Sequence, residues 1–305
     1  MNRPAQSSIP HPGTQLYDEA APADAAKRSR RARRVRLSWF GRIGLALVCF
    51  WLLMAVFGPM LAPYKEGALA SPFSFASYSL KHPFGTDYLG RDMLSRILIG
   101  ARYTVGLALG AAVLASGIGT CLGLVAAVSA RWVDEAMSRF FDALISIPSK
   151  VLALVAIAAF GSSIPMLTII AAVAYIPGAF RISRSLAVNL MTLEYVLVAR
   201  ARGERLFYIA RVEVLPNMIH PVMADFGLRF VFIVLLLSGL SFLGLGVQPP
   251  NADWGSLVRE NIGGLSQAAP AVLMPSIAIA TLTVGMNLLI DSLRRHSGFA
   301  QGGQK

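Results

Sequence analysis

Apolar residues along this chain are grouped in long blocks that alternate with polar and charged stretches. The blocks are close to the roughly 20 residues that cross a bilayer as an α-helix, whereas strands of an outer-membrane barrel alternate over about ten residues. We therefore predict an all-α integral membrane protein with six transmembrane helices. The predicted spans are Trp39–Leu61, Tyr103–Ala130, Phe140–Phe160, Ile164–Phe180, Ile219–Gly246 and Leu273–Ile290.

Two of these spans are interrupted. The third contains Asp142, Pro148 and Lys150, so we expect its first half to be wet or buried against protein and only Val151–Phe160 to be uninterrupted apolar helix. The fourth is short and ends near the pair Pro177-Gly178. Proline removes a backbone donor, so a kink is expected there, with freed carbonyls that need a neighbour.

Composition supports the membrane assignment. Hydrophobic residues make up 55% of the chain and charged residues 14%, and the mean hydropathy of +0.59 is too apolar for a soluble domain of 305 residues. The net charge of +12 would suggest nucleic-acid binding in a soluble protein. Here the basic residues concentrate in alternate connections between spans, as is typical of cytoplasmic loops. No nucleic-acid partner is therefore expected.

The distribution of Lys and Arg also predicts the orientation. Residues 27–36 contain seven basic side chains, and residues 181–211 contain six arginines. Both segments are expected in the cytoplasm, which places both termini inside. The protein is therefore expected to be multi-pass.

Residues that would carry enzymatic chemistry are sparse. Cys49 and Cys121 fall in apolar spans, which excludes a disulfide framework and a thiolate metal site. The four histidines lack the HExxH spacing of a helix-borne metal site, and there is no GxxxxGK[ST] phosphate loop. Glycine pairs such as Gly106 with Gly110 and Gly119 with Gly123 recur at helix-packing intervals instead. The chain is expected to be no enzyme and to bind no metal or cofactor, so nucleotide energy would come from another chain.

One polar interruption, Glu194–Asn217, is rich in charged and helix-forming residues. A charge at the centre of a bilayer costs at least about 2.5 to 3.5 kcal/mol, so the segment is predicted to be an aqueous loop. We expect a short helix over Glu194–Arg202, a change of direction at Gly203, and a second helix over Glu204–Val212 that Pro216 ends.

The first of these two helices has a small face. Val196, Ala199 and Gly203 lie on or near one side, where small side chains would allow close approach to a groove in a partner. The arginines available to an acidic rim of that groove are Arg200, Arg202 and Arg205. The alternative is a solvated loop whose arginines only follow the positive-inside rule.

This segment resembles the coupling motif of bacterial ABC importer permeases, which is Glu-Ala-Ala, three residues, Gly, nine residues, Ile, one residue, Leu-Pro. Ala199, Gly203 and Leu215-Pro216 match at the right spacing. Three positions depart from the motif, namely Leu197, Val198 and Glu213. The resemblance implies that the ATPase-coupling residues are Leu197, Val198, Ala199, Arg200, Gly203, Glu204, Arg205, Leu215 and Pro216.

Two further stretches resemble the dipeptide, oligopeptide and nickel branch of this family. The first runs from His82-Pro83-Phe84-Gly85-Thr86-Asp87 through Gly90-Arg91-Asp92 to Ser95-Arg96. The second is Leu240–Pro250, followed by Asp253-Trp254-Gly255. With the coupling motif, the likeness extends over about residues 37–295.

The resemblance implies a type I ABC importer permease with a cytoplasmic coupling helix, forming half of the path for peptides or similar small solutes. It also implies that the protein is located in a bacterial cytoplasmic (inner) membrane. The implied partners are a second homologous permease, two ATP-binding subunits that hold ATP and Mg, an external substrate-binding protein and membrane lipid. The substrate stays open among peptides, nickel chelates, opines and oligosaccharides. The expected parts are a disordered basic cytoplasmic N-terminus (1–38), the first transmembrane helix and external segment (39–101), the permease core (102–295) with its coupling segment (194–217), and a cytoplasmic tail (296–305).

Two other classes of protein stay open. A stand-alone channel or secondary carrier would not need a coupling segment. An intramembrane hydrolase would need a nucleophile and a base at membrane depth. The histidine nearest a span core, His220, stands at the start of a span beside Pro221, which gives that class little support.

Asp225 and Arg229 lie one helical turn apart in the fifth predicted span, where charges are costly unless they pair and face protein or water. They either line the translocation path and transmit the nucleotide state, or form a structural pair near the cytoplasmic end of the helix. Candidates for contact with the binding protein are Asp87, Arg91, Asp92, Asp253 and Trp254. Trp254 and Tyr88 would either cap the path or belong to the interfacial aromatic belt.

Overall fold

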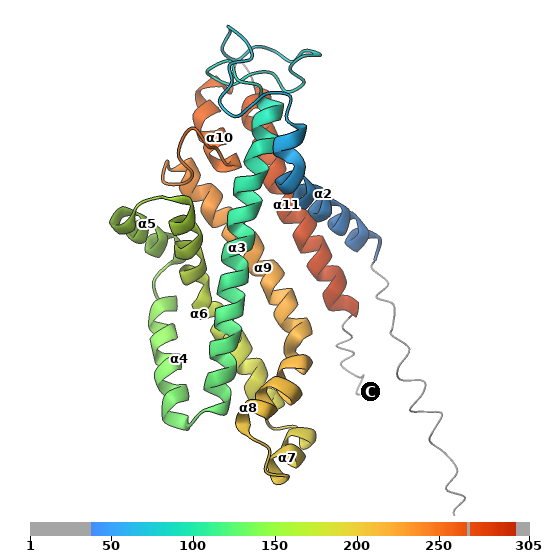
Figure 1. Ribbon diagram of the computed structural model, residues 1–305, viewed down its shortest axis with the longest axis vertical. Helices are drawn as coiled ribbons and strands as arrows, with labels where there is room; N and C mark the ends of the chain where they lie inside the picture. Colours follow the sequence, from blue (N-terminus) through green and yellow to red (C-terminus); the bar gives the residue numbers. More distant parts are fainter. Residues whose placement is uncertain (1–37, 267–268, 297–305) are drawn as a thin grey trace, which may run out of the picture. The chain divides into compact units, whose positions relative to one another are not determined.

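The computed structural model describes residues 38–266 and 269–296 (Figure 1). These residues belong to the second of two compact units of the chain, which begins at Leu37. The predicted disordered N-terminus and nearly all of the predicted tail lie outside the described ranges.

The described residues form helices joined by loops. In chain order the elements are α2 (Trp39–Leu61), α3 (Met93–Val128), α4 (Arg131–Ile145), α5 (Ser149–Phe160), α6 (Ile164–Leu190), α7 (Glu194–Ala201), α8 (Leu206–Tyr208), a π-helical segment η1 (Ile209–Val214), α9 (Leu215–Phe242), α10 (Trp254–Asn261), a 3₁₀ turn η2 (Ile262–Gly264) and α11 (Ala269–His296). Within the described ranges there is no β-strand, and the loop before α3 contains two isolated β-bridges.

Five helical segments are long and apolar enough to cross a membrane. They are Trp39–Leu61, Met93–Val128, Ile164–Leu190, Leu206–Phe242 and Pro270–Arg294. The bent pair α4 and α5 makes a sixth if it counts as one span. The prediction of an all-helical membrane protein is confirmed.

Helix α3 packs against α2, α6 and α9 and carries buried residues along its whole length. Its glycines allow the closest of these contacts. A β-carbon at Gly123 would lie 2.8 Å from the backbone nitrogen of Arg184 on α6, and one at Gly119 would overlap the side chain of Ala179. The interpretation of this glycine pair as a helix-packing device is confirmed.

The third predicted span is broken. Helices α4 and α5 meet at an angle of 85°, with the break at residues 146–148. Pro148 cannot donate a backbone hydrogen bond and disfavours helical geometry in the residue before it, which explains why the helix ends there. The fourth predicted span is longer than expected, because α6 continues through Pro177 to Leu190. Arg184 in this extension forms an ion pair with Asp134 on α4.

The second helix of the polar interruption also differs from its prediction. It begins at Leu206, passes through η1 and continues without a break into α9, so that Leu206–Phe242 is one span. Pro216 therefore does not end a helix. It lies inside the continuous segment, directly after the π-helical turns of η1.

The elements divide between two ends of the helices (Figure 1). Helix α7 lies at one end, and the loop between α2 and α3 lies with α10 at the other. We call these the α7 end and the α10 end.

Candidate coupling site and intramembrane bridge

Helix α7 turns Val196 and Ala199 inward. Val196 is fully buried and Ala199 is 5% exposed. Both join a buried apolar cluster whose other members are Leu124, Ala187, Met191, Ile209, Val214 and Met218. The prediction that Ala199 opens toward a partner is therefore wrong, because its side of the helix fixes α7 to η1 and to the start of α9.

The opposite side of this segment is exposed, and it is both apolar and basic. Leu197 and Val198 are about half exposed, and Phe207 is 75% exposed. The predicted coupling residues that are also exposed are Arg200, Gly203, Glu204, Arg205 and Pro216, whereas Leu215 is half-buried. Phe207 was missed by sequence reasoning. The sequence pattern that could have identified it is a large aromatic side chain just after a charged turn.

The turn after α7 is a Schellman motif, and it requires a glycine. Gly203 has φ +79°, a left-handed conformation that strains any residue with a β-carbon. Its N–H donates to the Arg200 oxygen over 2.9 Å, and the Glu204 N–H donates to the Ala199 oxygen over 3.2 Å. The expected change of direction at Gly203 is confirmed. A β-carbon there would meet nothing within 4 Å, so the constraint comes from the backbone.

The π-helical segment joins this turn to α9. Such segments insert an extra residue into a helix and are frequent at functional sites. The side-chain nitrogen of Asn217 donates to the Glu213 oxygen over 2.6 Å, which satisfies a carbonyl in the segment. The helical backbone runs on from Leu206 through this segment into α9.

Asp225 and Arg229 form a buried ion pair on α9, with side chains 13% and 7% exposed. Nε of Arg229 lies 2.6 Å from one Asp225 oxygen and Nη2 lies 3.1 Å from the other. The third arm, Nη1, donates to the backbone oxygen of Tyr175 on α6 over 2.8 Å. These contacts support the structural alternative, because both charges are used in a bridge between α6 and α9.

The bridge also depends on a glycine. A β-carbon at Gly178 would lie 2.9 Å from Nη1 of Arg229, so this position gives the guanidinium its room. Pro177 was expected to free a carbonyl that needs a neighbour. In a helix that carbonyl belongs to Val173, four residues earlier, whereas Arg229 donates to the carbonyl of Tyr175.

A buried ion cluster holds the α10 end together. Asp87 accepts from Nε of Arg91 over 2.6 Å and from Nη1 of Arg96 over 2.7 Å. Glu260 on α10 accepts from the same two arginines over 3.0 and 2.8 Å. Because two carboxylates face two guanidinium groups, the cluster is neutral and ties the loop before α3 to α3 and α10.

The five candidates for contact with the binding protein are all buried. Their exposed fractions are at most 8%, and they are Asp87, Arg91, Asp92, Asp253 and Trp254. A direct contact with another protein is contradicted by this burial. The physical reason is that Asp87, Arg91 and Asp92 form ion pairs within the chain, whereas Asp253 caps a helix and Trp254 packs in the core. Charged residues in a polar segment were assumed to face water, and no pattern in the sequence shows that they meet one another.

Trp254 belongs to the core of the fold. It is 0% exposed, its Nε1 donates to the Ile97 oxygen over 3.0 Å, and its ring packs edge-on against Trp51 at 4.6 Å. The interfacial-belt interpretation of Trp254 is therefore wrong. Asp253, the residue before it, caps α10 by accepting from the Ser256 N–H over 3.0 Å. Burial raises the pKa of Asp253, because the charged carboxylate loses its hydration.

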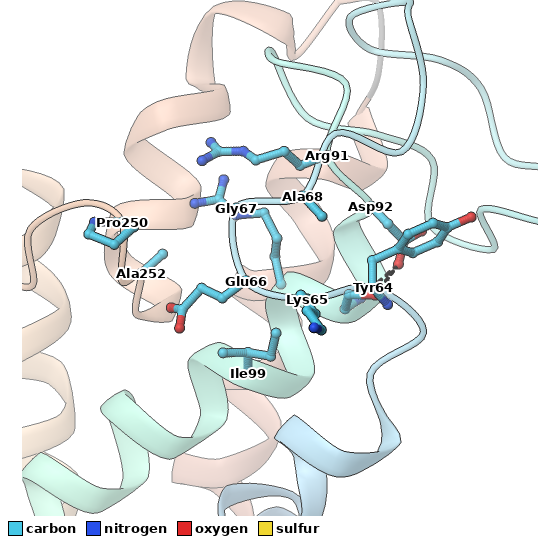
Figure 2. A pocket seen from close by; sticks show the side chains of 12 residues that line it. Tyr64, Lys65, Glu66, Gly67, Ala68, Arg91, Asp92, Ile99, Pro250 and Ala252 are labelled. Carbon is cyan, nitrogen blue, oxygen red and sulfur yellow. Dashed lines mark hydrogen bonds between the residues drawn. The ribbon is translucent and has the colours of Figure 1, made fainter.

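A small pocket lies beside the ion cluster (Figure 2). Figure 2 shows the side chains of Arg91 and Glu66 extending toward the segment that holds Pro250 and Ala252. Partial burial raises the pKa of Glu66, against a hydrogen bond with Tyr103 that lowers it. The space is about 10 Å³, roughly that of one water, so it is too small for a transported solute.

Comparisons with known proteins agree with this architecture. Residues 119–298 match the family described as binding-protein-dependent transport system inner membrane component. The dipeptide transport system permease protein DppC of Alkalihalophilus pseudofirmus is 32% identical over 252 residues, which cover 83% of each chain. The glutathione transport system permease protein GsiD of Pectobacterium atrosepticum is 33% identical over 216 residues, or 71% of this chain and 72% of the relative. The di/tripeptide transport system permease protein DppC of Pseudomonas aeruginosa is 30% identical over 257 residues, or 82% and 85%.

The long apolar helices make this a multi-pass membrane protein, and the family match places it in the transport class. The chain belongs to the family of binding-protein-dependent transport system inner membrane components, the permeases of ABC importers. It is a transport permease and not an enzyme, and it works as one component of a multi-subunit transporter.

Proposed function

We propose that this permease forms half of the translocation path of an ATP-driven importer, together with a second homologous permease. Two separate ATP-binding subunits bind ATP and Mg and dock at the α7 end, and an external substrate-binding protein delivers the solute at the α10 end. The observation that carries this proposal is the exposed apolar and basic face of residues 197–207 on a rigid turn continuous with α9.

The docking face has the chemistry of a protein interface. Exposed Leu197, Val198 and Phe207 offer apolar surface, and an exposed aromatic of this kind is a frequent interface anchor. Exposed Arg200 and Arg205 offer donors to an acidic rim. Apolar side chains on an aqueous segment that also carries charges are better explained by a partner protein than by lipid.

Coupling follows from the way the segment is built. The inward side chains of Val196 and Ala199 fix α7 to η1, and the Schellman turn fixes its angle. A push on α7 by ATPase closure therefore tilts α9 as a lever. The Arg229 bridge to Tyr175 makes α6 move with it, so that the two spans flanking the coupling segment alternate access together.

The orientation is proposed from charge. The α7 end carries the arginine-rich segment 181–211, which favours the cytoplasm. The α10 end then faces outward from a bacterial inner membrane, and both termini are cytoplasmic. For the solute we propose peptides or similar small molecules, because the relatives above are named for dipeptide, di/tripeptide and glutathione transport.

The test is purification of the intact transporter with a tag on this chain, followed by mass spectrometry of the recovered subunits. The variant is Gly203→Asp. Its matched control is Gly67→Asp, because Gly67 has φ +78° in an aqueous loop at the α10 end and also has nothing within 4 Å of a β-carbon. The two glycines therefore match in φ and in the space around a β-carbon, and they differ in location.

We expect the wild type and Gly67→Asp to recover a second permease and the ATP-binding subunits, and Gly203→Asp to lose the ATP-binding subunits. ATPase recruitment that survives Gly203→Asp unchanged would contradict the docking site. A well-folded wild type that recovers neither partner, and still transports, would favour a stand-alone channel or secondary carrier.

A further inference from the structure

At the α10 end, most negative side chains are buried and most exposed charged side chains are positive. Within residues 62–102 and 243–266, the acidic side chains Asp87, Asp92 and Asp253 are at most 3% exposed, and Glu260 is held by two arginines. The charged residues of these segments that remain exposed are Lys65, Glu66, Lys81, Arg102 and Arg259. The exposed charged residues at this end are therefore four positive and one negative, which makes the accessible surface basic.

The most exposed part of this surface is a tight turn. The N–H of Ser79 donates to the His82 oxygen over 2.9 Å, and the N–H of His82 donates back to the Ser79 oxygen over 3.1 Å. The turn presents Leu80, whose relative exposure is 104%, beside the exposed Lys81. Tyr78, just before the turn, is 79% exposed. We call residues 78–81 the finger.

The finger is anchored by a buried side chain. His82 is 8% exposed, and its Nδ1 lies 3.0 Å from an Asp92 oxygen. The other Asp92 oxygen accepts from the N–H and the hydroxyl of Ser95, at the start of α3, over 2.8 and 2.7 Å. Tyr64 donates its N–H to the same Ser95 hydroxyl. An anchored finger loses little conformational entropy when it binds.

The fold itself does not use the apolar tip. A leucine at full exposure buries nothing in this chain, and an exposed lysine is disfavoured at the end of a membrane protein that faces outward. Both residues are therefore available to a partner. Leu80 and Tyr78 fit an apolar recess, and Lys81, with Lys65 nearby in the same loop, fits an acidic rim around it.

We propose that the finger is a docking element for the external substrate-binding protein, and that its target is an apolar recess rimmed by carboxylates. This inference rests on the proposed function. Charge complementarity selects the partner, since every buried carboxylate at this end is already paired or serves as a helix cap, which leaves the acidic half of the interface to the other protein.

The experiment uses the whole transporter in nanodiscs and, purified separately, the substrate-binding protein encoded beside the genes of the recovered subunits. The dissociation constant is measured by biolayer interferometry at 50 and 300 mM salt for the wild type, Leu80→Ser, Lys81→Glu and the double variant. The control is Arg131→Glu, which makes the same change in net charge at the α7 end on a side chain that is 92% exposed. ATPase recruitment is measured on each sample.

We expect the double variant to weaken binding at least tenfold and Lys81→Glu to reduce the salt dependence, whereas Arg131→Glu changes neither. Equal affinity in all samples, or an equal loss in the control, would overturn the inference. A loss of association with phosphatidylglycerol vesicles, at unchanged affinity for the binding protein, would assign the finger to lipid and also overturn it. ATPase recruitment without any binding of the delivery protein would overturn the finger and leave the docking site at α7 standing.

Discussion

Arg229 on α9 donates a hydrogen bond from Nη1 to the backbone oxygen of Tyr175 on α6, over 2.8 Å. The same guanidinium forms a two-armed ion pair with Asp225 one turn earlier. Tyr175 makes a second hydrogen bond between the two helices, because its hydroxyl donates to the Phe232 oxygen on α9 over 3.3 Å. The two spans on either side of the coupling segment are thus held together by a buried charge and by a tyrosine.

The buried pair should behave as one unit in a double-mutant cycle. Removing one partner of a buried ion pair typically costs about 3 to 5 kcal/mol, because the other charge is left without compensation. We expect Asp225→Asn to be the most destabilising change, since it leaves the Arg229 charge with only the Tyr175 carbonyl. The double variant with Arg229→Gln should lose less than the sum of the two single changes.

Thermal unfolding of the purified transporter and solute uptake in vesicles check this expectation. Uptake that falls in proportion to stability in all three variants would support the bridge as a structural pair. Uptake that collapses in Arg229→Gln at unchanged stability would instead place the guanidinium in the translocation path. Additive losses in stability would contradict the pairing itself.

Gly178→Ala tests the room that the bridge needs. The added β-carbon would lie 2.9 Å from Nη1, so the guanidinium must shift, which weakens its bond to Tyr175. A hydrogen bond to a charged group is worth about 1.5 to 3 kcal/mol, which exceeds the roughly 1 kcal/mol that alanine gains over glycine in a helix. The variant should therefore be less stable than the wild type. Gly117→Ala is the matched control, because a β-carbon there meets nothing within 4 Å, and it should be neutral or slightly stabilising.

Equal unfolding temperatures for Gly178→Ala and Gly117→Ala would show that the bridge tolerates a methyl group. A shift of several degrees between them, with the Gly178 variant lower, is the expected result.

Asp87→Asn should loosen the α10 end. It removes a carboxylate shared by Arg91 and Arg96, and leaves Glu260 to compensate two buried guanidinium groups. The expected loss is about 3 to 5 kcal/mol. Limited proteolysis of the loop before α3 measures it locally. Glu135→Gln, in a pair whose side chains are 92% and 50% exposed, is the control and should leave the digestion pattern unchanged. Faster cleavage in both variants would mean that the cluster has no special role.

The spans could be predicted from the sequence because their signal is local. A block of apolar residues fixes a membrane helix without reference to the rest of the chain, and the coupling segment is visible as the charged interruption between two blocks. The glycine pair at Gly119 and Gly123 was also visible, since helix-packing spacing is a local pattern. The break at Pro148 was signalled by proline, although its angle was not.

The misassigned residues depend on distant contacts. Asp87 meets Glu260 only through two arginines, across more than 160 positions of chain, so its burial has no local signature. Ala199 was assigned to the outer face of α7, yet a helix of eight residues with charges on several sides does not reveal which side packs inward. Trp254 faces Ile97 and Trp51, both far earlier in the chain. Only the tertiary fold distinguishes a buried tryptophan from an interfacial one.

Burial of Asp253 decides in which direction its charge changes the stability of the protein. Its raised pKa means that the folded state holds the proton more tightly than the unfolded chain, so the stability linked to this group is fully present below its ordinary pKa of 3.8 and is lost as the pH rises through the folded value. At neutral pH the buried charge is therefore unfavourable.

Asp253→Asn removes the charge and keeps an oxygen for the Ser256 N–H, and asparagine caps helices as well as aspartate does. Asp253→Ala loses the cap as well, at about 1 kcal/mol. We expect the Asn variant to match or exceed the wild type in unfolding temperature at pH 7, to lose that advantage toward pH 4, and to stay above the Ala variant throughout. An Asn variant less stable than the Ala variant at pH 7 would show that the carboxylate charge itself stabilises α10.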